Sequence, residues 1–417
     1  MKKALLFKAW LNPAKCCLLF IFLMVLSLGC RKANFDKNDL RDFQQVTLVA
    51  NNAGYSPQLT DPTLQNAWGL AWAPVGIAWV NSMAGHVSEL YTAEGAIVRP
   101  PVNIPSPTDT IGGFPTGIVF AGGAGFKLAN NLPPNFLFAG IDGVLSGWNG
   151  GNNAQRIANN SSTSAYTGLA LATKNGSHFL YAANFRTGKI DVWDTTFTAV
   201  TMPFLDAGLP QGYSPFNIQS VGPWLFVEYA KIGTDGRDQA GAGLGFVNVF
   251  NTGGVLIRRF ASKGTLNAPW GVVLTPANFL DNNDMQDNDH GNNKGGHDGS
   301  GGNNSGPGSG NSGSGNSNNG SGNNNSGPGN NNNGRNDIRQ RPVILVGNFG
   351  DGRINVFSLE GEFLGQLQSH NRTIVIDRLW ALAFAPTTAT MVDPERLYFT
   401  AGPNNETDGI FGYLIKK

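Results

Sequence analysis

A short apolar strand recurs in a turn-rich setting along the chain from residue 67 onward. A second apolar strand and a turn follow most copies, and a third strand with alternating character ends in an aromatic residue. This period-two alternation is typical of strands in stacked sheets, and helical periodicity is nearly absent. The six copies of the first strand lie at residues 67–72, 115–120, 166–171, 215–219, 269–274 and 379–384.

The constant spacing of these copies predicts a β-propeller. With residues 281–340 set aside, the copies recur about every 50 residues, and propeller blades run at about 40 to 50 residues. An ordinary β-sandwich does not need six similar units at one spacing. We therefore predict an all-β fold with six blades of about four strands each.

The two ends of the repeat region predict how the ring closes. The last copy supplies three strands before the sequence ends, whereas the strand-like residues 43–50 precede the first copy. Pairing residues 43–50 with the strand around residues 409–414 would remove two exposed sheet edges. We expect one propeller domain over residues 43–417, closed by this N-terminal strand.

Residues 281–340 have a different composition from the rest of the chain. Asn, Gly and Ser dominate this stretch, and large apolar side chains are almost absent. Such a segment has little to bury against the entropy of ordering, so we predict a disordered insertion in the fifth blade. Its Asp281, Asp284, Asp287 and Asp289 look like a calcium loop, but the expected Gly and the closing Glu are absent.

The first 30 residues look like a targeting segment. Residues 16–29 form an apolar run after several lysines, and a membrane-spanning helix needs about 20 apolar residues. Residues 26–30, Leu-Ser-Leu-Gly-Cys, resemble the lipobox of bacterial lipoproteins, although Ser27 replaces the usual aliphatic residue. The resemblance implies a signal peptide over residues 1–29, lipidation of Cys30, a polar tether over residues 30–42 and a lipid anchor at the bacterial cell envelope, in the outer membrane. An ordinary signal peptide and a retained anchor are the alternatives.

Charge and cysteine content exclude several classes of function. The chain has 29 Lys and Arg against 28 Asp and Glu, and four of the lysines lie in the predicted signal peptide. No basic excess remains for a nucleic-acid partner. All three cysteines, Cys16, Cys17 and Cys30, precede the repeats, so the propeller has no disulfide, Cys-based metal site or catalytic thiol.

Several segments resemble a conserved, functionally uncharacterised family of bacterial secreted proteins. The more distant resemblance is to the six-bladed propellers of the NHL-repeat and SMP-30 types. This kinship implies the fold but no activity, so function must be argued from the site. The segments are NAWGLAW, YAANFRTGKIDVWD, SPFNIQ, NAPWGVVLTP, LVGNFGDGRINVFSLEGEFLGQL and LYFTAGPNNETDGIFG.

The loops at one face of the propeller carry the candidate binding residues. In propellers, the loop before each inner strand and the loop between the second and third strands meet at the mouth of the central channel. Polar side chains there suit a hard cation, or polyols and sugars. The candidates are Asn66, Asn217, Asn267, Asp377, Arg186 and Arg353, with Arg378, Asp235 and Asp351 in the same loops.

The SMP-30 resemblance also implies a divalent-metal site. Lactonases of that type hold a divalent ion with carboxylate and Asn side chains, and calcium is a suitable ion here. Turn formation is the alternative role for such residues, as Asp142-Gly143 and Asp351-Gly352 illustrate. Trp68, Trp270 and Trp380 share one repeat position and are predicted to be blade core rather than sugar-stacking residues. The metal candidates are Asp142, Asn184, Glu228 and Asn348.

Three classes of function remain open. The first is an envelope-tethered binding or scaffold module whose ligand is a small molecule, a glycan or a protein. The second is a divalent-metal-assisted hydrolase, such as a lactonase, or a lyase, and the third is a structural or protein-partner role. The first class needs only a propeller and a lipid anchor, so the sequence favours it.

Overall fold

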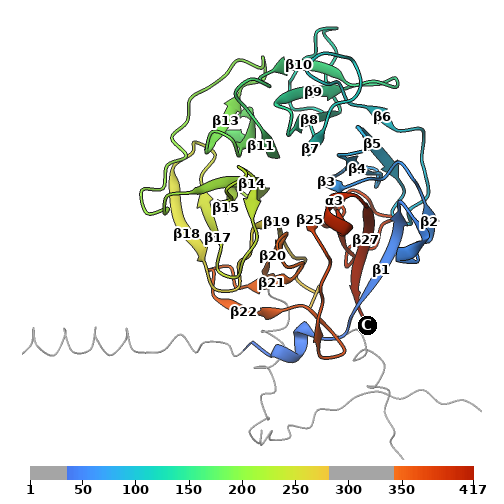
Figure 1. The fold of residues 1–417 in the computed structure, drawn as a ribbon, viewed down its shortest axis with the longest axis vertical. Helices are drawn as coiled ribbons and strands as arrows, with labels where there is room; N and C mark the ends of the chain where they lie inside the picture. The colour runs from blue at the N-terminus through green and yellow to red at the C-terminus, as the bar shows by residue number, and fades with distance from the viewer. Residues whose placement is uncertain (1–34, 281–341) are drawn as a thin grey trace, which may run out of the picture. The chain divides into compact units, whose positions relative to one another are not determined.

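Six mainly antiparallel sheets stand around a central channel in the computed structural model (Figure 1). The structure describes residues 35–280 and 342–417. The predicted signal peptide, the predicted lipidation site Cys30 and the predicted disordered insertion therefore lie outside the described residues. No helix among the described residues is both long enough and apolar enough to cross a membrane. The predicted six-bladed, nearly all-β architecture is confirmed.

Each blade begins with its inner strand at the channel and continues outward by antiparallel pairing. The first blade consists of β3 (Ala67–Trp72), β4 (Ala78–Ser82), β5 (Val87–Tyr91) and β6 (Val102–Asn103). The second consists of β7 (Pro115–Phe120), β8 (Phe136–Gly140), β9 (Val144–Trp148) and β10 (Gln155–Asn159). The third consists of β11 (Tyr166–Lys174), β12 (Ser177–Asn184) and β13 (Lys189–Trp193).

The remaining blades follow the same order, and the sixth takes its outer strands from the N-terminal side of the chain. The fourth blade consists of β14 (Tyr213–Val221), β15 (Trp224–Ile232), β17 (Gly245–Phe250) and β18 (Leu256–Ser262), with β16 (Asp238–Gln239) beside β15. The fifth consists of β19 (Pro269–Leu274), β20 (Ile344–Asn348), β21 (Ile354–Phe357) and β22 (Phe363–Gln366). The sixth consists of β25 (Leu379–Ala383), β26 (Leu397–Ala401), β27 (Ile410–Lys416), β1 (Phe43–Ala50) and β2 (Leu59–Thr60).

The described residues contain very little helix. A two-stranded hairpin, β23 (Gln368–Ser369) and β24 (Arg372–Thr373), follows the fifth blade. The short helical turns are η1 (Lys37–Leu40), η2 (Ala53–Tyr55) and α3 (Pro403–Glu406). Leu40 of η1 is only 2% exposed, and the main-chain carbonyl of Asp39 accepts a hydrogen bond from Lys416. The end of the predicted polar tether, at Asp39 and Leu40, is therefore packed against the propeller.

The ring closes through β1 and β27, as the sequence predicts. The two strands pair antiparallel from Phe43 opposite Lys416 to Ala50 opposite Ile410. β2 then pairs in parallel with the last two residues of β1. In this way the sixth blade gains its fourth strand from the opposite end of the chain, and β27 has no open edge.

The third blade departs from the expectation of about four strands. A single bridge joins Trp193 to Ala199, and the amide of Val200 donates to the carbonyl of Val192, but no fourth strand follows. Pro203 comes shortly after, and proline has no N–H to donate to a sheet ladder. The edge of β13 is therefore covered by a short extended segment instead of a strand.

The glycine near the middle of four inner strands, at residues 69, 117, 168 and 271, is explained by close contact between blades. A Cβ atom on Gly69 would lie 2.2 Å from the carbonyl oxygen of Thr116, and one on Gly271 would lie 2.7 Å from that of Trp380. Real Cβ atoms do not approach so closely, so these positions need glycine because one backbone packs directly against the next. The repeated glycine of the sequence sets the spacing of the inner strands.

A buried acidic cluster lies in the first blade, close to the closure. Asp61 and Glu89 are both buried, and the hydroxyl oxygen of Thr63 lies 2.6 Å from a carboxyl oxygen of each. Tyr91 donates to the other oxygen of Asp61 at 2.8 Å. A hydroxyl has one proton to donate, so the second short contact needs a proton on a carboxyl group. Burial, reinforced by the charge of Asp61, raises the pKa of Glu89 to about 7.

We expect Glu89 to make stability depend on pH. Because its pKa in the folded protein lies above its usual 4.5, its stabilising contribution is complete below pH 4.5 and is lost as pH rises through about 7. Glu89→Gln keeps a neutral hydrogen-bonding side chain, so the variant should lose less stability than wild type across this window, by about 3 kcal/mol. Urea unfolding at a series of pH values measures the difference. Glu360→Gln, at an exposed turn, is the control, and identical pH profiles for wild type and Glu89→Gln would contradict the neutral carboxyl.

Truncation tests the closing strand. A chain that begins at residue 37 keeps η1 and β1, so it should unfold cooperatively like the full chain. A chain that begins at residue 53 lacks β1 and exposes the edge of β27, so it should unfold without a single cooperative transition or aggregate. Calorimetry and light scattering compare the two. Cooperative unfolding of the shorter chain would show that β1 is dispensable.

Candidate functional site

Aromatic side chains fill the centre of the channel. Trp68 and Trp380 stack with ring centroids 3.5 Å apart, and Phe349 also stacks on Trp380, with ring centroids 4.0 Å apart. Trp270 meets Trp380 edge-on at 5.8 Å. All three tryptophans are buried, in agreement with the predicted core role. They come from inner strands of the first, fifth and sixth blades, so the cluster joins these blades across the channel.

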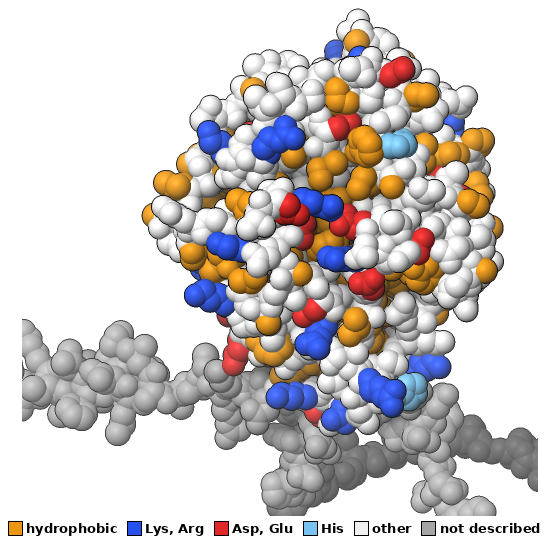
Figure 2. Space-filling view, in the orientation of Figure 1, with side chains coloured by type: hydrophobic (Ala, Val, Ile, Leu, Met, Phe, Trp, Pro, Cys, Tyr) orange, Lys and Arg blue, Asp and Glu red, His pale blue; other side chains and the backbone are white. Residues whose placement is uncertain are grey.

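A cavity of about 420 Å³ lies against this cluster. Trp68, Phe185 and Phe216 give it an aromatic wall, and residues 235–238 of the fourth blade give it a charged wall. Its other residues come from loops that precede inner strands and from turns between second and third strands. The two kinds of loop thus meet at one face, as predicted. Figure 2 shows acidic and basic side chains gathered around the hollow in the middle of this face.

Trp68 lines the cavity and has an unsatisfied, buried hydrogen-bond donor. The side chain is only 2% exposed, and its indole nitrogen has no hydrogen-bond partner among the described residues. A buried donor without an acceptor loses about 1 to 3 kcal/mol of solvation free energy. Trp380, stacked on it, donates to the side-chain oxygen of Asn66 at 2.8 Å. The two stacked rings therefore differ, because only the indole N–H of Trp68 lacks an acceptor among the described residues.

An ion pair crosses the channel mouth. Arg237 of the fourth blade lies 2.6 Å from Glu406 of α3 in the sixth blade. Asn66 also donates to Glu406, at 3.1 Å. The pair is partly exposed, so its net contribution to stability is small. The ion pair instead fixes the relative position of two loops from different blades at the edge of the cavity.

The backbone of α3 is strained where it presents Glu406. Asn404, Asn405 and Glu406 have φ of 55°, 55° and 67°, in the left-handed region. Asparagine tolerates this region, but glutamate rarely adopts it. A residue such as Glu406 in this region costs about 1 kcal/mol or more of folding free energy. Asp377 accepts a hydrogen bond from the amide of Asn404 at 3.2 Å and helps to hold this turn. Strain of this kind is typical of functional sites.

Asp238 is the titratable group of the cavity that is most perturbed. Burial and, to a smaller extent, the nearby charge of Glu406 raise its pKa to about 6, against the opposite effect of Arg237 and Arg378. The carboxyl group therefore changes its protonation state close to neutral pH. The ionised carboxylate can accept a hydrogen bond from a ligand, and the protonated carboxyl group can donate one to it.

The predicted ligand-binding residues have several different positions. Arg186 lines the cavity and donates to the carbonyl of Ser161, while Asn66 and Asp377 support the neighbouring turn at α3. Asn217 faces a separate inner cavity and donates to the carbonyl of Trp270 at 2.7 Å. Asn267 accepts from the amide of Gly241, and Arg353 is exposed at a turn of the fifth blade.

Three of the four predicted metal ligands have turn-forming hydrogen bonds. Asn184 accepts from the amides of Ala165 and Thr187 and donates to Asp191. Asn348 accepts from the amide of Asn267 and donates to the carbonyl of Thr265 and to Asp351. Asp142 accepts from the amides of Phe114 and Val144, and burial raises its pKa. Within residues 35–280 and 342–417, no group of three or more His, Cys, Asp or Glu is arranged to hold a metal ion.

Glu228, the fourth metal candidate, is fully buried in β15. Neither carboxyl oxygen has a partner from another described residue, and burial raises its pKa well above the usual value. The corresponding position holds Asn81 in the first blade and Thr400 in the sixth, and both donate to a carbonyl of the next blade. A protonated Glu228 is a donor of the same kind, so the geometry favours a neutral carboxyl group.

Sequence reasoning missed Arg237, Asp238 and Glu406 and did not assign Trp68 to a binding surface. Arg237 and Asp238 lie in a long connection between β15 and β17 that has no counterpart in the other blades. The length of this connection was the available signal. Glu406 follows the Asn404-Asn405 pair, whose residue type favours left-handed turns, but no spacing links it to the fourth blade.

Comparison of sequences finds relatives without a known activity. No protein-family model matches the chain. An uncharacterised protein of Acanthamoeba polyphaga mimivirus is 30% identical over 263 residues, which are 61% of this chain and 52% of that protein. A second is 26% identical over 386 residues, 88% of this chain and 79% of that protein. The chain thus spans about half the length of the first relative, and kinship with a bacterial secreted family stays a prediction.

Comparison of structures finds other proteins with low similarity. A gluconolactonase from Xanthomonas campestris has a TM-score of 0.44 and 12% identity, over 84% of this chain and 87% of that chain. A streptogramin B lyase has a TM-score of 0.44 and 9% identity, over 89% and 96%. At such scores neither similarity supports an argument about function. The blade count stands on the strand pairing within this chain.

Substitution of Glu228 separates a neutral core acid from a metal ligand. If the carboxyl is neutral, Glu228→Gln should be at least as stable as wild type at pH 8, because the amide cannot ionise. Added calcium at about 1 mM should then shift the melting temperature of both proteins equally. Thermal melts with calcium and with a chelator measure this. A calcium-dependent stabilisation that wild type shows and Glu228→Gln lacks would instead identify a metal ligand.

Proposed function

We propose that the propeller is a binding module that takes a sugar or a related polyhydroxylated ring at the channel mouth. The observation that carries the proposal is the buried, unpartnered indole N–H of Trp68, a residue that lines the cavity. A ligand hydroxyl supplies the acceptor that this donor lacks. The volume of about 420 Å³ is within the range of ligand pockets.

The chemistry of the walls suits a polyol better than a simple ion. The rings of Trp68, Phe185 and Phe216 are buried, but they make this wall of the cavity apolar, which favours contact with the C–H groups of a sugar. Arg186 and Arg237 are donors, while Asp235 and Asp238 supply acceptors. Hydroxyl groups both donate and accept, so they match this balanced set, whereas a ligand of one charge meets both signs.

We also propose that the module is tethered to the bacterial cell envelope through a lipid on Cys30. The lipobox-like residues 26–30 support this location. The short apolar run of the same segment supports a cleaved signal peptide rather than a spanning helix. A scaffold role toward a protein partner is compatible with the same tether.

Sugar binding and its dependence on Trp68 can be tested together. We expect wild type to bind at least one member of a panel of mono- and oligosaccharides in isothermal titration calorimetry. Trp68→Phe keeps an aromatic ring but removes the N–H, so it should weaken binding about 5- to 30-fold, the loss expected for one buried hydrogen bond.

Trp224→Phe is the matched control, because Trp224 is exposed at the start of β15 and does not line the cavity. Its affinity should equal that of wild type, and thermal melts check that each variant is folded. Absence of binding to every sugar in the panel, or equal affinity of Trp68→Phe and wild type, would overturn the proposal.

A further inference from the structure

The face of the propeller opposite the channel mouth, which we call the back face, carries a set of exposed apolar side chains. Each inner strand leads away from the channel mouth, so the turns between first and second strands, and between third and fourth strands, lie on the back face. Six of these turns expose one apolar side chain each, and we call these side chains the apolar turn tips. They are Val75, Ile97, Leu132, Val255, Leu359 and Met391.

The apolar turn tips are accessible and come from five of the six blades. Val75 is 77% exposed and Met391 is 96% exposed. The turns that carry these two side chains adjoin, because the hydroxyl of Thr388 donates to the carbonyl of Pro74 at 2.8 Å. Single exposed apolar residues are common on proteins, but a set of them at the turns of one face indicates a surface that leaves water.

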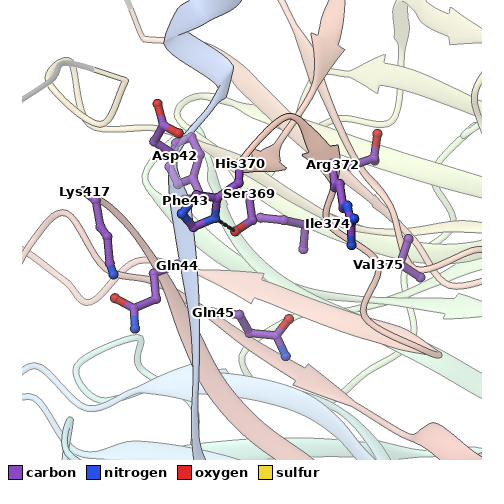
Figure 3. Close-up of a pocket in the computed structure, with 11 residues that line it drawn as sticks. Asp42, Phe43, Gln44, Gln45, Ser369, His370, Arg372, Ile374, Val375 and Lys417 are labelled. Atoms are coloured by element: carbon purple, nitrogen blue, oxygen red, sulfur yellow. Dashed lines mark hydrogen bonds between the residues drawn. The ribbon is translucent and has the colours of Figure 1, made fainter.

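The chain enters the propeller at the back face. β27, the third strand of its blade, ends there, and β1 begins there, with Phe43 opposite Lys416. Figure 3 shows Asp42, Phe43 and Lys417 beside a groove of about 930 Å³ at this end of the two strands. The carbonyl of Leu280 also accepts from Lys416, so the Asn/Gly-rich insertion starts at the same face. Its polar composition is compatible with a layer of lipid headgroups.

The proposed tether to Cys30 is short. Residues 31–36 separate Cys30 from η1, and such a stretch spans at most about 25 Å when it is fully extended. η1 is fixed at the end of the β1–β27 pair, because Lys416 donates to the carbonyl of Asp39. A lipid on Cys30 therefore brings the membrane to the rim or to the back face, and the apolar turn tips favour the back face.

A fluid lipid surface fits the apolar turn tips better than a protein partner. The core of a protein interface is a contiguous apolar patch, whereas these tips end separate turns of five blades. Charges of both signs lie at the same two sets of turns, with Glu94 and Glu360 against Lys127 and Lys174. This balance suits zwitterionic phospholipids, because a surface of one charge would repel half of these groups.

We propose that the back face lies on a phospholipid bilayer, with the apolar turn tips inserted among the headgroups, so that the channel mouth opens away from the membrane. The proposal rests on the proposed tether for its orientation. Insertion removes the apolar turn tips from water and adds to the attachment that the lipid provides. The cavity at the channel mouth then stays accessible to a soluble ligand.

Photocrosslinking of the full chain in phosphatidylcholine vesicles tests this orientation. p-Benzoylphenylalanine in place of Met391 should form a lipid adduct on irradiation. The same group in place of Leu205, which is 70% exposed in the loop before β14 on the channel-mouth face, is the matched control. Mass spectrometry should find the lipid adduct at residue 391 at least about tenfold more often than at residue 205, because inserted groups lie about 5 to 10 Å below the surface.

Val75→Asp combined with Val255→Asp should lower the adduct at residue 391 at least about threefold, because two charged tips resist insertion. Equal lipid adducts at residues 391 and 205, no lipid adduct at residue 391, or crosslinks from residue 391 to a protein instead of lipid would overturn the proposal. Thermal melts check that each variant is folded. The mass of the N-terminal peptide in the same samples tests the lipid on Cys30 separately, so an unmodified Cys30 contradicts the tether while the adduct at residue 391 still decides the docking.

Discussion

The ladder between β1 and β27 is the interaction on which the rest of the ring depends. It supplies the sixth blade with its outer strand and thereby holds that blade against the first. The stack of Trp68 on Trp380 joins the same two blades at the channel. Because Trp68 also forms a wall of the cavity, the geometry of the proposed binding site follows from the closure of the ring.

The glycines of the inner strands and the aromatic cluster belong to one arrangement. Glycine lets neighbouring inner strands touch, so the channel is narrow enough for a few large rings to fill it. The rings then separate the channel-mouth cavity from the inner cavity that Asn217 lines. Substitution of Gly69 by alanine would bring a Cβ atom against the carbonyl oxygen of Thr116. It would force the first and second blades apart and would thereby disturb the aromatic cluster.

The architecture could be predicted from sequence because each blade repeats the same local requirement. The apolar strand recurs at a constant spacing, and the unpaired residues 43–50 indicate closure. The site could be predicted only in part. Arg186 lies in a turn of the expected kind, but Arg237 and Glu406 meet across the channel from different blades, and no local spacing encodes that meeting. Asn184 and Asn348 show the opposite difficulty, because one side-chain type serves turns and ligands equally well.

The position of the two ends of the closing ladder also determines how the ring responds to force. Phe43 lies opposite Lys416, so both chain ends leave from the same end of the β1–β27 pair. Tension between them loads the ladder from that end and opens its hydrogen bonds one after another, as a zipper opens. The Nζ of Lys416 donates to the carbonyls of Asp39 and Leu280 at the loaded end. These two hydrogen bonds of Lys416 must break before the first main-chain hydrogen bond between β1 and β27 does.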